Sequence, residues 1–155
     1  MSKDKNQDET APNQARNIVI NAQYVKDLSF ENPNAPQSLI GKGKQPKIDI
    51  SVDIQVKALE EKTFEVTLVL NANAKTDDKQ MFITELSYAG VFTVDVPENE
   101  RQPLLMVYCP SILFPFARRI ISDATRDGGF PPLMLDPIDF GSLFAQHKAQ
   151  QASAS

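Results

Sequence analysis

Four segments of the chain alternate apolar and polar residues with a period of two, which is the pattern of half-buried β-strands. The clearest segment covers 48–58, where every even position is apolar and every odd position is polar. Similar alternation covers 18–31, 64–73 and 82–95, and Lys26 interrupts the even row of the first segment. The even positions therefore form the predicted core face of a sheet, and the odd positions form a wet face.

The links between these segments predict how the strands are connected. Short polar links, EEK and TDDK, join the last three segments, which predicts an antiparallel meander. The link after the first segment, NPNAPQSLIGKGKQP, is long and rich in Pro and Gly. It allows the first strand to cross over and lie beside the fourth, as in a Greek key. In that register the even row of the first strand places Tyr24 on the core face.

Beyond residue 96 the apolar spacing changes to i, i+3, i+4, which predicts helix. We expect one helix of about four turns, beginning near Pro110 and ending at the Gly128-Gly129 pair. A second helix is expected to begin at Asp136, with Pro137 in its first position. The predicted fold class is therefore α+β, with a four-stranded antiparallel, Greek-key-like sheet and two helices packed on one face.

Length and charge limit the class of protein. The chain has 155 residues, which suits one domain, and a net charge of −4, which argues against nucleic acid as the main partner. Residues 1–16 are polar and lack the apolar segment of a signal peptide, so we expect a disordered arm, a folded domain over 17–146 and a flexible tail over 147–155. The longest apolar run, 103–117, is shorter than the ~20 residues that span a bilayer. We therefore expect a cytoplasmic protein without direct membrane insertion.

Candidate catalytic and metal-binding residues are few. The chain has one His and one Cys, too few for a structural zinc site. Cys109 lies among apolar residues, which is typical of an inert buried thiol, and His147 lies in a polar stretch. The sequence contains no phosphate-binding or nucleophile-elbow motif. We therefore predict that the protein is not an enzyme and needs no cofactor; a small-molecule enzyme with a cleft between helix and sheet is the least favoured alternative.

The wet face carries an excess of acidic residues. If the first and fourth strands are neighbours, Asp27, Glu31 and Glu85 lie close together with Ile83 exposed beside them. A basic partner could dock there, although periodicity alone favours a merely solvated face. Surplus apolar residues on the first helix and in the crossover link indicate assembly or a binding groove.

Three stretches of the chain, YVKDLSFENPNAP, FITELSYAGVF and YCPSILFPFARRIISDATRDGGFPPLMLDPIDF, closely resemble the SecB family of protein-export chaperones from Gram-negative bacteria. The resemblance runs from about Asn17 to Ala145, and CPxxLFPxAR followed by GxFPxLxLxPxxF is its most specific signature. It implies an ATP-independent holdase that binds non-native precursor proteins, keeps them translocation-competent and delivers them to the SecA motor. It implies no cofactor.

The resemblance also implies three sets of site residues. In SecB-like proteins unfolded clients lie in an apolar groove between the crossover loop, the second strand and the second helix, and the matching residues are Leu39, Ile40, Ile48, Ile50, Val52, Leu143 and Phe144. The zinc-binding C-terminal segment of SecA docks on the outer sheet face, at positions matching Asp27, Glu31, Ile83 and Glu85. The first helix lies at the centre of a homotetramer, a dimer of dimers, which implies an oligomer interface at Ile112, Phe116 and Ile120.

A general or toxin–antitoxin-linked chaperone on the same scaffold, without an export role, is the alternative. The residues at the motor-docking positions favour export, because a chaperone of the other kind has no need of Asp27, Glu31 and Glu85.

Overall fold

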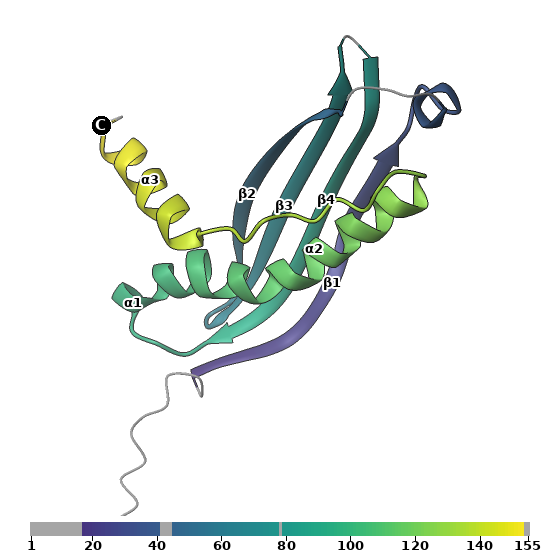
Figure 1. The fold of residues 1–155 in the computed structure, drawn as a ribbon. Helices are drawn as coiled ribbons and strands as arrows, with labels where there is room; N and C mark the ends of the chain where they lie inside the picture. Colours follow the sequence, from purple (N-terminus) through teal and green to yellow (C-terminus); the bar gives the residue numbers. More distant parts are fainter. Residues whose placement is uncertain (1–16, 41–44, 78, 154–155) are drawn as a thin grey trace, which may run out of the picture.

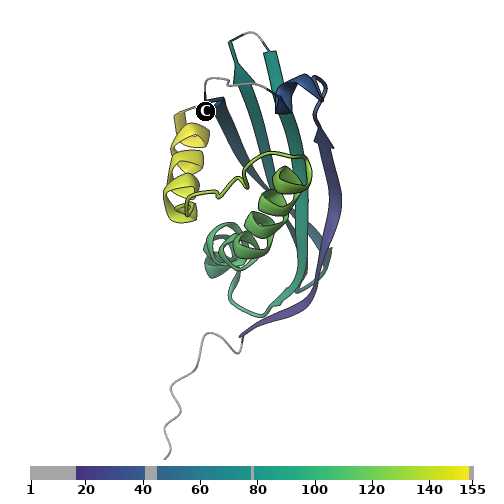
Figure 2. The same cartoon turned by 45° about the vertical axis from the view of Figure 1, so that its right-hand side comes forward.

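A computed structural model describes residues 17–40, 45–77 and 79–153. One long antiparallel sheet is crossed on a single face by a long helical segment (Figure 1). Turning the molecule shows the helices on one side of the sheet and an open face on the other (Figure 2). The arm predicted for residues 1–16 lies outside the described residues.

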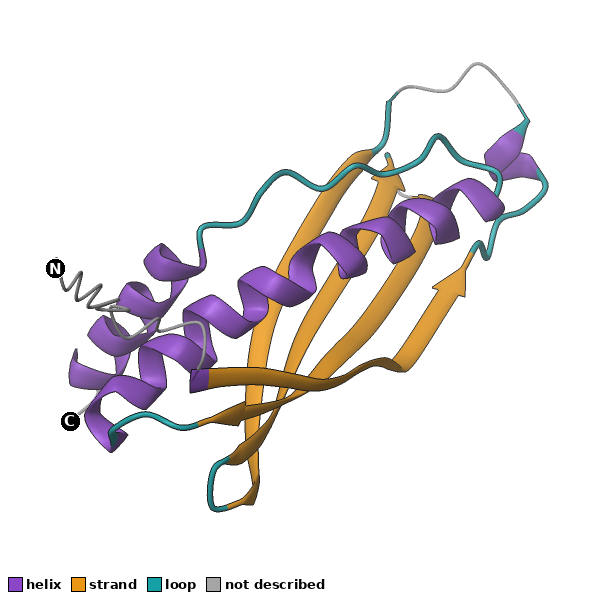
Figure 3. Cartoon of the chain, turned by 90° about the horizontal axis from the view of Figure 1, so that it is seen from below, coloured by secondary structure: helices purple, strands orange, loops and turns teal. Residues whose placement is uncertain are grey.

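The sheet contains β1 (Ile18–Glu31), β2 (Lys47–Glu60), β3 (Thr63–Thr76) and β4 (Lys79–Val94), in the spatial order β1-β4-β3-β2. All neighbouring strands are antiparallel. The described part of the connection from β1 to β2 includes a short 3-10 turn, Gln37–Leu39, at one end of the sheet (Figure 3). This order confirms the predicted four-stranded sheet and leaves β1 and β2 as its two edges.

The core lies between β3, β4 and the long helix, where the even positions point inward as predicted. Leu68, Leu86 and Phe92 are completely buried there. Leu113 and Ile121 cover them from the helix. Burying each such side chain stabilises the fold by about 1.5–3 kcal/mol, so this layer holds the helix to the sheet.

The face assignment for part of β1 is wrong at Ala22 and Tyr24. The pairing of β1 with β4 shifts between Ile20 and Ala22 and again between Val25 and Asp27. Each shift inserts one extra residue and reverses the faces, so Tyr24 pairs with Ala89 on the open face. The second shift cancels the first, and strict alternation resumes from Asp27.

The helical segment begins earlier than predicted. It comprises α1 (Glu98–Pro103), a π-helical turn (Leu104–Tyr108) and α2 (Cys109–Asp127). The π-helical turn ends two residues before Pro110, whose ring would otherwise crowd the carbonyl one turn back. The 98–127 segment is long and apolar enough to cross a bilayer by length and hydropathy alone, criteria that buried core helices also meet. Its buried side packs on the sheet.

The last helix, α3 (Phe140–Ser153), begins later than the sequence predicts. Asp139, and not Asp136, caps it: the backbone N–H of Ser142 donates to Asp139 Oδ1 at 3.0 Å. The Ser142 hydroxyl also donates to Asp139 Oδ2, at 2.8 Å. The backbone and then the side-chain hydrogen bond from Ser142 hold the pKa of Asp139 below its usual range. The helix continues through residues 147–153, where the sequence predicts a flexible tail.

Candidate functional site

Four residues on the open face form an acidic patch, defined here as Asp27, Glu31, Ile83 and Glu85. Glu31 pairs directly with Ile83. Glu85 pairs with Ser29, which lies between Glu31 and Asp27 on β1. The three carboxylates are exposed, and within the described ranges none has a hydrogen bond or ion pair. Neighbouring side chains on one sheet face lie about 4.5–8 Å apart, so their negative charges act together on a partner. The structure therefore brings together the four residues that the sequence placed on one face.

The strand next to the patch contributes two residues that sequence reasoning missed. Asn71 pairs with Glu85, and Asn73 pairs with Ile83. Both lie at odd positions of β3, so alternation alone could have added them. Behind the patch, the hydroxyl of buried Thr84 donates to the Ser29 carbonyl at 2.9 Å. This bond ties β1 to β4 where the patch lies.

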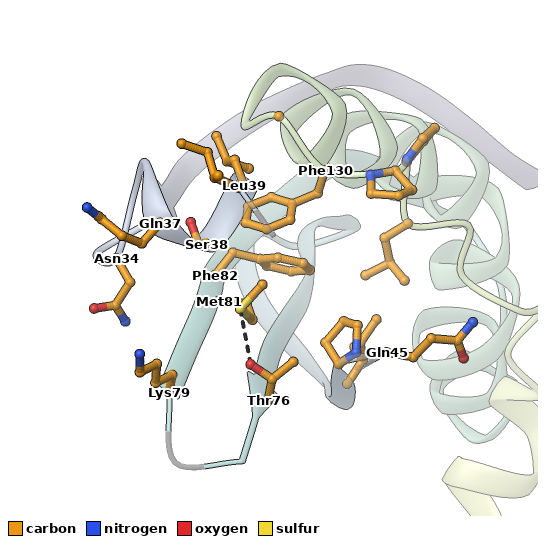
Figure 4. A pocket seen from close by; sticks show the side chains of 17 residues that line it. Asn34, Gln37, Ser38, Leu39, Gln45, Thr76, Lys79, Met81, Phe82 and Phe130 are labelled. Carbon is orange, nitrogen blue, oxygen red and sulfur yellow. Dashed lines mark hydrogen bonds between the residues drawn. The ribbon is translucent and has the colours of Figure 1, made fainter. Parts of the chain in front are cut away.

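On the opposite face, an apolar hollow of about 1060 Å³ opens between the 3-10 turn, the start of β2 and the segment after α2. Leu39, Ile40 and Ile48 line it, as the resemblance implies. Figure 4 shows Phe82 and Phe130 at its centre, with their ring centroids 5.0 Å apart. The even pattern assigned Phe82 to the core, and Phe130 follows no period, so neither was predicted to line the site.

Two glycines at the end of α2 hold this hollow in shape. A Cβ atom on Gly128 would lie 2.2 Å from the Phe30 ring, and one on Gly129 would lie 2.9 Å from Leu39. Gly129 also has a φ of +93°, which side chains rarely allow. The Asn32 amide donates to the Gly128 carbonyl at 3.3 Å. Side chains of the β1 end and of the crossover segment therefore pack directly against the backbone at the end of α2.

A second, smaller hollow of about 260 Å³ lies farther along β2, under α3. Val52, Leu143 and Phe144 line it, again as the resemblance implies. Ile50 lines neither hollow and is 47% exposed. Six of the seven groove residues implied by the resemblance therefore line two separate hollows. The distance along β2 from residue 48 in the first hollow to residue 52 in the second is roughly 13 Å.

The helix residues expected at an oligomer interface share one stripe of α2. Phe116 is 41% exposed, and its ring stacks on Tyr88 with centroids 6.2 Å apart. Ile112 and Ile120, one turn to either side, are partly buried. Sequence reasoning missed a second group beside this stripe, on the helix side of edge strand β1, where three apolar residues are 44–45% exposed: Ile20, Val25 and Leu28.

The described residues offer little for covalent chemistry. Cys109 is completely buried, and burial raises the pKa of its thiol to about 12, so it is not a nucleophile at neutral pH. Across residues 17–40, 45–77 and 79–153, no group of His, Cys, Asp and Glu could hold a metal ion.

A polar cluster on the open face, here the Tyr24 cluster, joins Tyr24, Lys26 and Glu65. The Tyr24 hydroxyl and the Lys26 ammonium both donate to the Glu65 carboxylate, the second at 2.9 Å. Burial, and then the hydrogen bond to Glu65, raise the pKa of Tyr24 to about 12. The hydrogen bond from Tyr24, followed by that from Lys26, lowers the pKa of Glu65.

These shifts predict how the contribution of the Tyr24–Glu65 bond to stability depends on pH. Because the pKa of Glu65 is lowered, the contribution is complete above its ordinary value of 4.5 and is lost as pH falls through the folded value. Because the pKa of Tyr24 is raised, the contribution is complete below 10.0 and is lost as pH rises through about 12. Tyr24→Phe should lower the free energy of unfolding by about 1 kcal/mol at neutral pH. In urea unfolding, that difference should shrink as the pH falls below 4.5 and Glu65 takes up a proton; a constant difference would contradict the prediction.

The chain matches the family model described as Preprotein translocase subunit SecB over residues 11–151. Protein-export protein SecB from Maricaulis maris (strain MCS10) is 51% identical over 148 residues, covering 95% of this chain and 86% of the relative. The SecB protein from Parvibaculum lavamentivorans is 52% identical over 143 residues, covering 92% of this chain and 85% of the relative.

Among solved structures, the Mycobacterium tuberculosis Rv1957 SecB-like chaperone, in complex with a ChAD peptide from the Rv1956 HigA1 antitoxin, is similar with a TM-score of 0.66. It is 18% identical, and the match covers 80% of this chain and 93% of that chain. At this identity the likeness shows the α+β fold alone.

Proposed function

Since the chain belongs to the SecB family of protein-export chaperones, we propose that it acts as an ATP-independent holdase in the cytoplasm. It binds non-native precursor proteins, keeps them competent for translocation and delivers them to the SecA motor. SecB is a family of chaperones and not of enzymes, in keeping with the inert thiol at Cys109.

The observation that carries this proposal is the placement of an apolar hollow and an acidic patch on opposite faces of one sheet. Leu39, Ile40 and Ile48 line the hollow on the helix side, while Glu31 and Glu85 lie on the open side. A holdase needs apolar surface that many sequences can use reversibly. Delivery needs a second surface that stays free while a client is bound. Both requirements are met without any catalytic group.

We assign the two hollows beside β2 to unfolded clients and the acidic patch to the basic, zinc-binding C-terminal segment of SecA. Ile83 adds an apolar side chain at the Glu31 end of the patch, and Glu85 lies between it and the Asp27 end. Such a mixed surface suits a basic segment that also carries apolar side chains.

We further propose that the protein is a homotetramer, a dimer of dimers. The stripe of Ile112, Phe116 and Ile120 continues through the Phe116–Tyr88 stack to Val25, which pairs with Tyr88 on edge strand β1. Exposed apolar side chains on two neighbouring elements, here Phe116 on α2 and Val25 on β1, are typical of an interface between copies.

A general or toxin–antitoxin-linked chaperone on this scaffold is the less favoured alternative. The relatives that are 51–52% identical are protein-export proteins, whereas the likeness to the antitoxin-associated chaperone is 18%. The acidic patch also favours export, because a chaperone without a motor partner has no use for it.

The decisive test is Glu85→Lys. Reversing this charge puts an ammonium group into the patch, so binding of the zinc-loaded C-terminal peptide of SecA should weaken by more than about tenfold. Binding to the unchanged protein should also weaken with added salt, because exposed charges are screened. Isothermal titration calorimetry at two salt concentrations measures both effects.

Glu60→Lys is the matched control, since Glu60 is exposed on the same face but lies at the far end of β2, opposite Thr63, and lines neither hollow. It should bind the peptide normally. Both variants should still slow the refolding of an unfolded client without ATP, because the hollows are on the other face. Failure of the unchanged protein to bind the peptide at any salt would favour the general chaperone.

A further inference from the structure

Edge strand β1 reverses its faces for a short stretch between its two bulges. The pairing shifts after Ile20 and again after Val25. Tyr24 lies between these two shifts, and for this reason its side chain is on the open face. A bulge leaves the ladder locally disrupted and strengthens the strand twist. Two bulges within a few residues of an edge strand need other contacts to fix the register.

The Tyr24 cluster supplies such contacts across three strands. Tyr24 belongs to β1 and Glu65 to β3, and the strand between them is β4. Tyr24 pairs with Ala89, which in turn pairs with Thr67. Ala89 is 0% exposed and Thr67 is 4% exposed, although none of the described helices lies on this face. The tyrosine side chain must cross this buried pair to reach the Glu65 carboxylate.

The cluster also controls a charge beside the acidic patch. Lys26 is the extra residue of the second bulge and directly precedes Asp27. Its ammonium group is held 2.9 Å from Glu65, whose side chain is only 13% exposed. Without that carboxylate, the ammonium would be free to approach Asp27 and weaken the negative field of the patch.

We propose that Tyr24 and Glu65 are positioning residues for the acidic patch. They hold the second bulge in register, so that Asp27 lies on the open face beside Glu85, and they keep the Lys26 charge away from Asp27. The inference rests on the proposed docking of SecA at this patch. Lys57, which pairs with Glu65 from β2, is the other charged side chain facing the cluster, while β4 contributes only Ala89 and Val91 there.

The test compares the full chain with Tyr24→Phe and Glu65→Gln. Two quantities are measured: the affinity for the zinc-loaded C-terminal peptide of SecA, and hydrogen exchange of the β1 amides. We expect each variant to bind the peptide about three- to tenfold more weakly, the range typical of residues that act through a neighbour. Amides of residues 21–27 should exchange faster in both variants. Glu60→Gln removes a carboxylate from the same face, at the far end of β2, and should change neither quantity.

A double variant separates positioning from charge. Lys26→Gln combined with Glu65→Gln should recover part of the affinity lost in Glu65→Gln, because the released ammonium is gone, while its β1 amides still exchange fast. Normal affinity in both single variants would overturn the proposal, even if exchange were faster, because the cluster would then only stabilise β1.

The docking function and this inference fail in different ways. If the unchanged protein does not bind the peptide at any salt concentration, the docking function is wrong and the positioning role falls with it. In that case hydrogen exchange still tests whether the Tyr24 cluster holds the second bulge in register. Unchanged exchange at residues 21–27 in both variants refutes this role, and faster exchange supports it.

Discussion

Phe116→Asp is expected to break the proposed tetramer into smaller species. The Phe116 ring is 41% exposed in the single chain and stacks on Tyr88. In a dimer of dimers with α2 at its centre, this ring is buried between copies. An unpaired carboxylate in the same place costs about 3–5 kcal/mol, which is enough to shift the assembly at micromolar concentration. Light scattering coupled to size-exclusion chromatography measures the mass directly.

Gln55→Asp is the matched control for this experiment. Gln55 is exposed on the open face of β2, so the substitution introduces the same charge away from the helix layer. Its mass should equal that of the unchanged protein. If Phe116→Asp also keeps the full mass, the α2 stripe is not the interface, and the exposed row on β1 becomes the surface to test.

Gly128→Ala is expected to destabilise the end of the molecule that carries the larger hollow. The new Cβ atom would lie 2.2 and 2.3 Å from two atoms of the Phe30 ring. That ring stacks on Phe82 with centroids 5.7 Å apart, so it cannot move without disturbing the wall of the hollow. Overpacking of this kind costs about 1–3 kcal/mol. Urea unfolding should show that loss, and client binding should weaken with it.

Gly141→Ala provides the control, because its new Cβ atom would meet only Asp139 Oδ1 at 3.3 Å. Alanine in the first turn of α3 favours the helix but must displace the capping oxygen by a few tenths of an ångström, so its net change should be well below that of Gly128→Ala. Equal stability of Gly128→Ala and the unchanged protein would show that the Phe30 ring can turn aside and that the hollow is not rigid.

The alternation of apolar and polar residues predicts most of the sheet because β2, β3 and β4 pair nearly without interruption. It fails at Tyr24 because the first bulge, at Asn21, adds one residue without interrupting the even row of apolar residues. The interaction that uses the reversed face joins residues 41 positions apart, from Tyr24 to Glu65. Lys26, the break in the even row, was the local sign of the second bulge.

The helices show a similar division. The stripe of Ile112, Phe116 and Ile120 follows directly from helical spacing, whereas the start of the helical segment does not. Pro110 argued for a late start, but the π-helical turn Leu104–Tyr108 keeps the segment continuous from Glu98. The hollow was also hard to predict, because Phe130 is brought to Phe82 by a segment without regular period.

The burial of Cys109 has a practical consequence. This is the only cysteine of the chain, and it lies completely covered at the start of α2. With its pKa raised to about 12, almost no reactive thiolate exists at neutral pH. An alkylating reagent therefore reacts only when the start of the helix lifts from the sheet. The rate of that reaction in the unmodified protein measures how often the helical layer opens, with and without a client, and no label needs to be introduced.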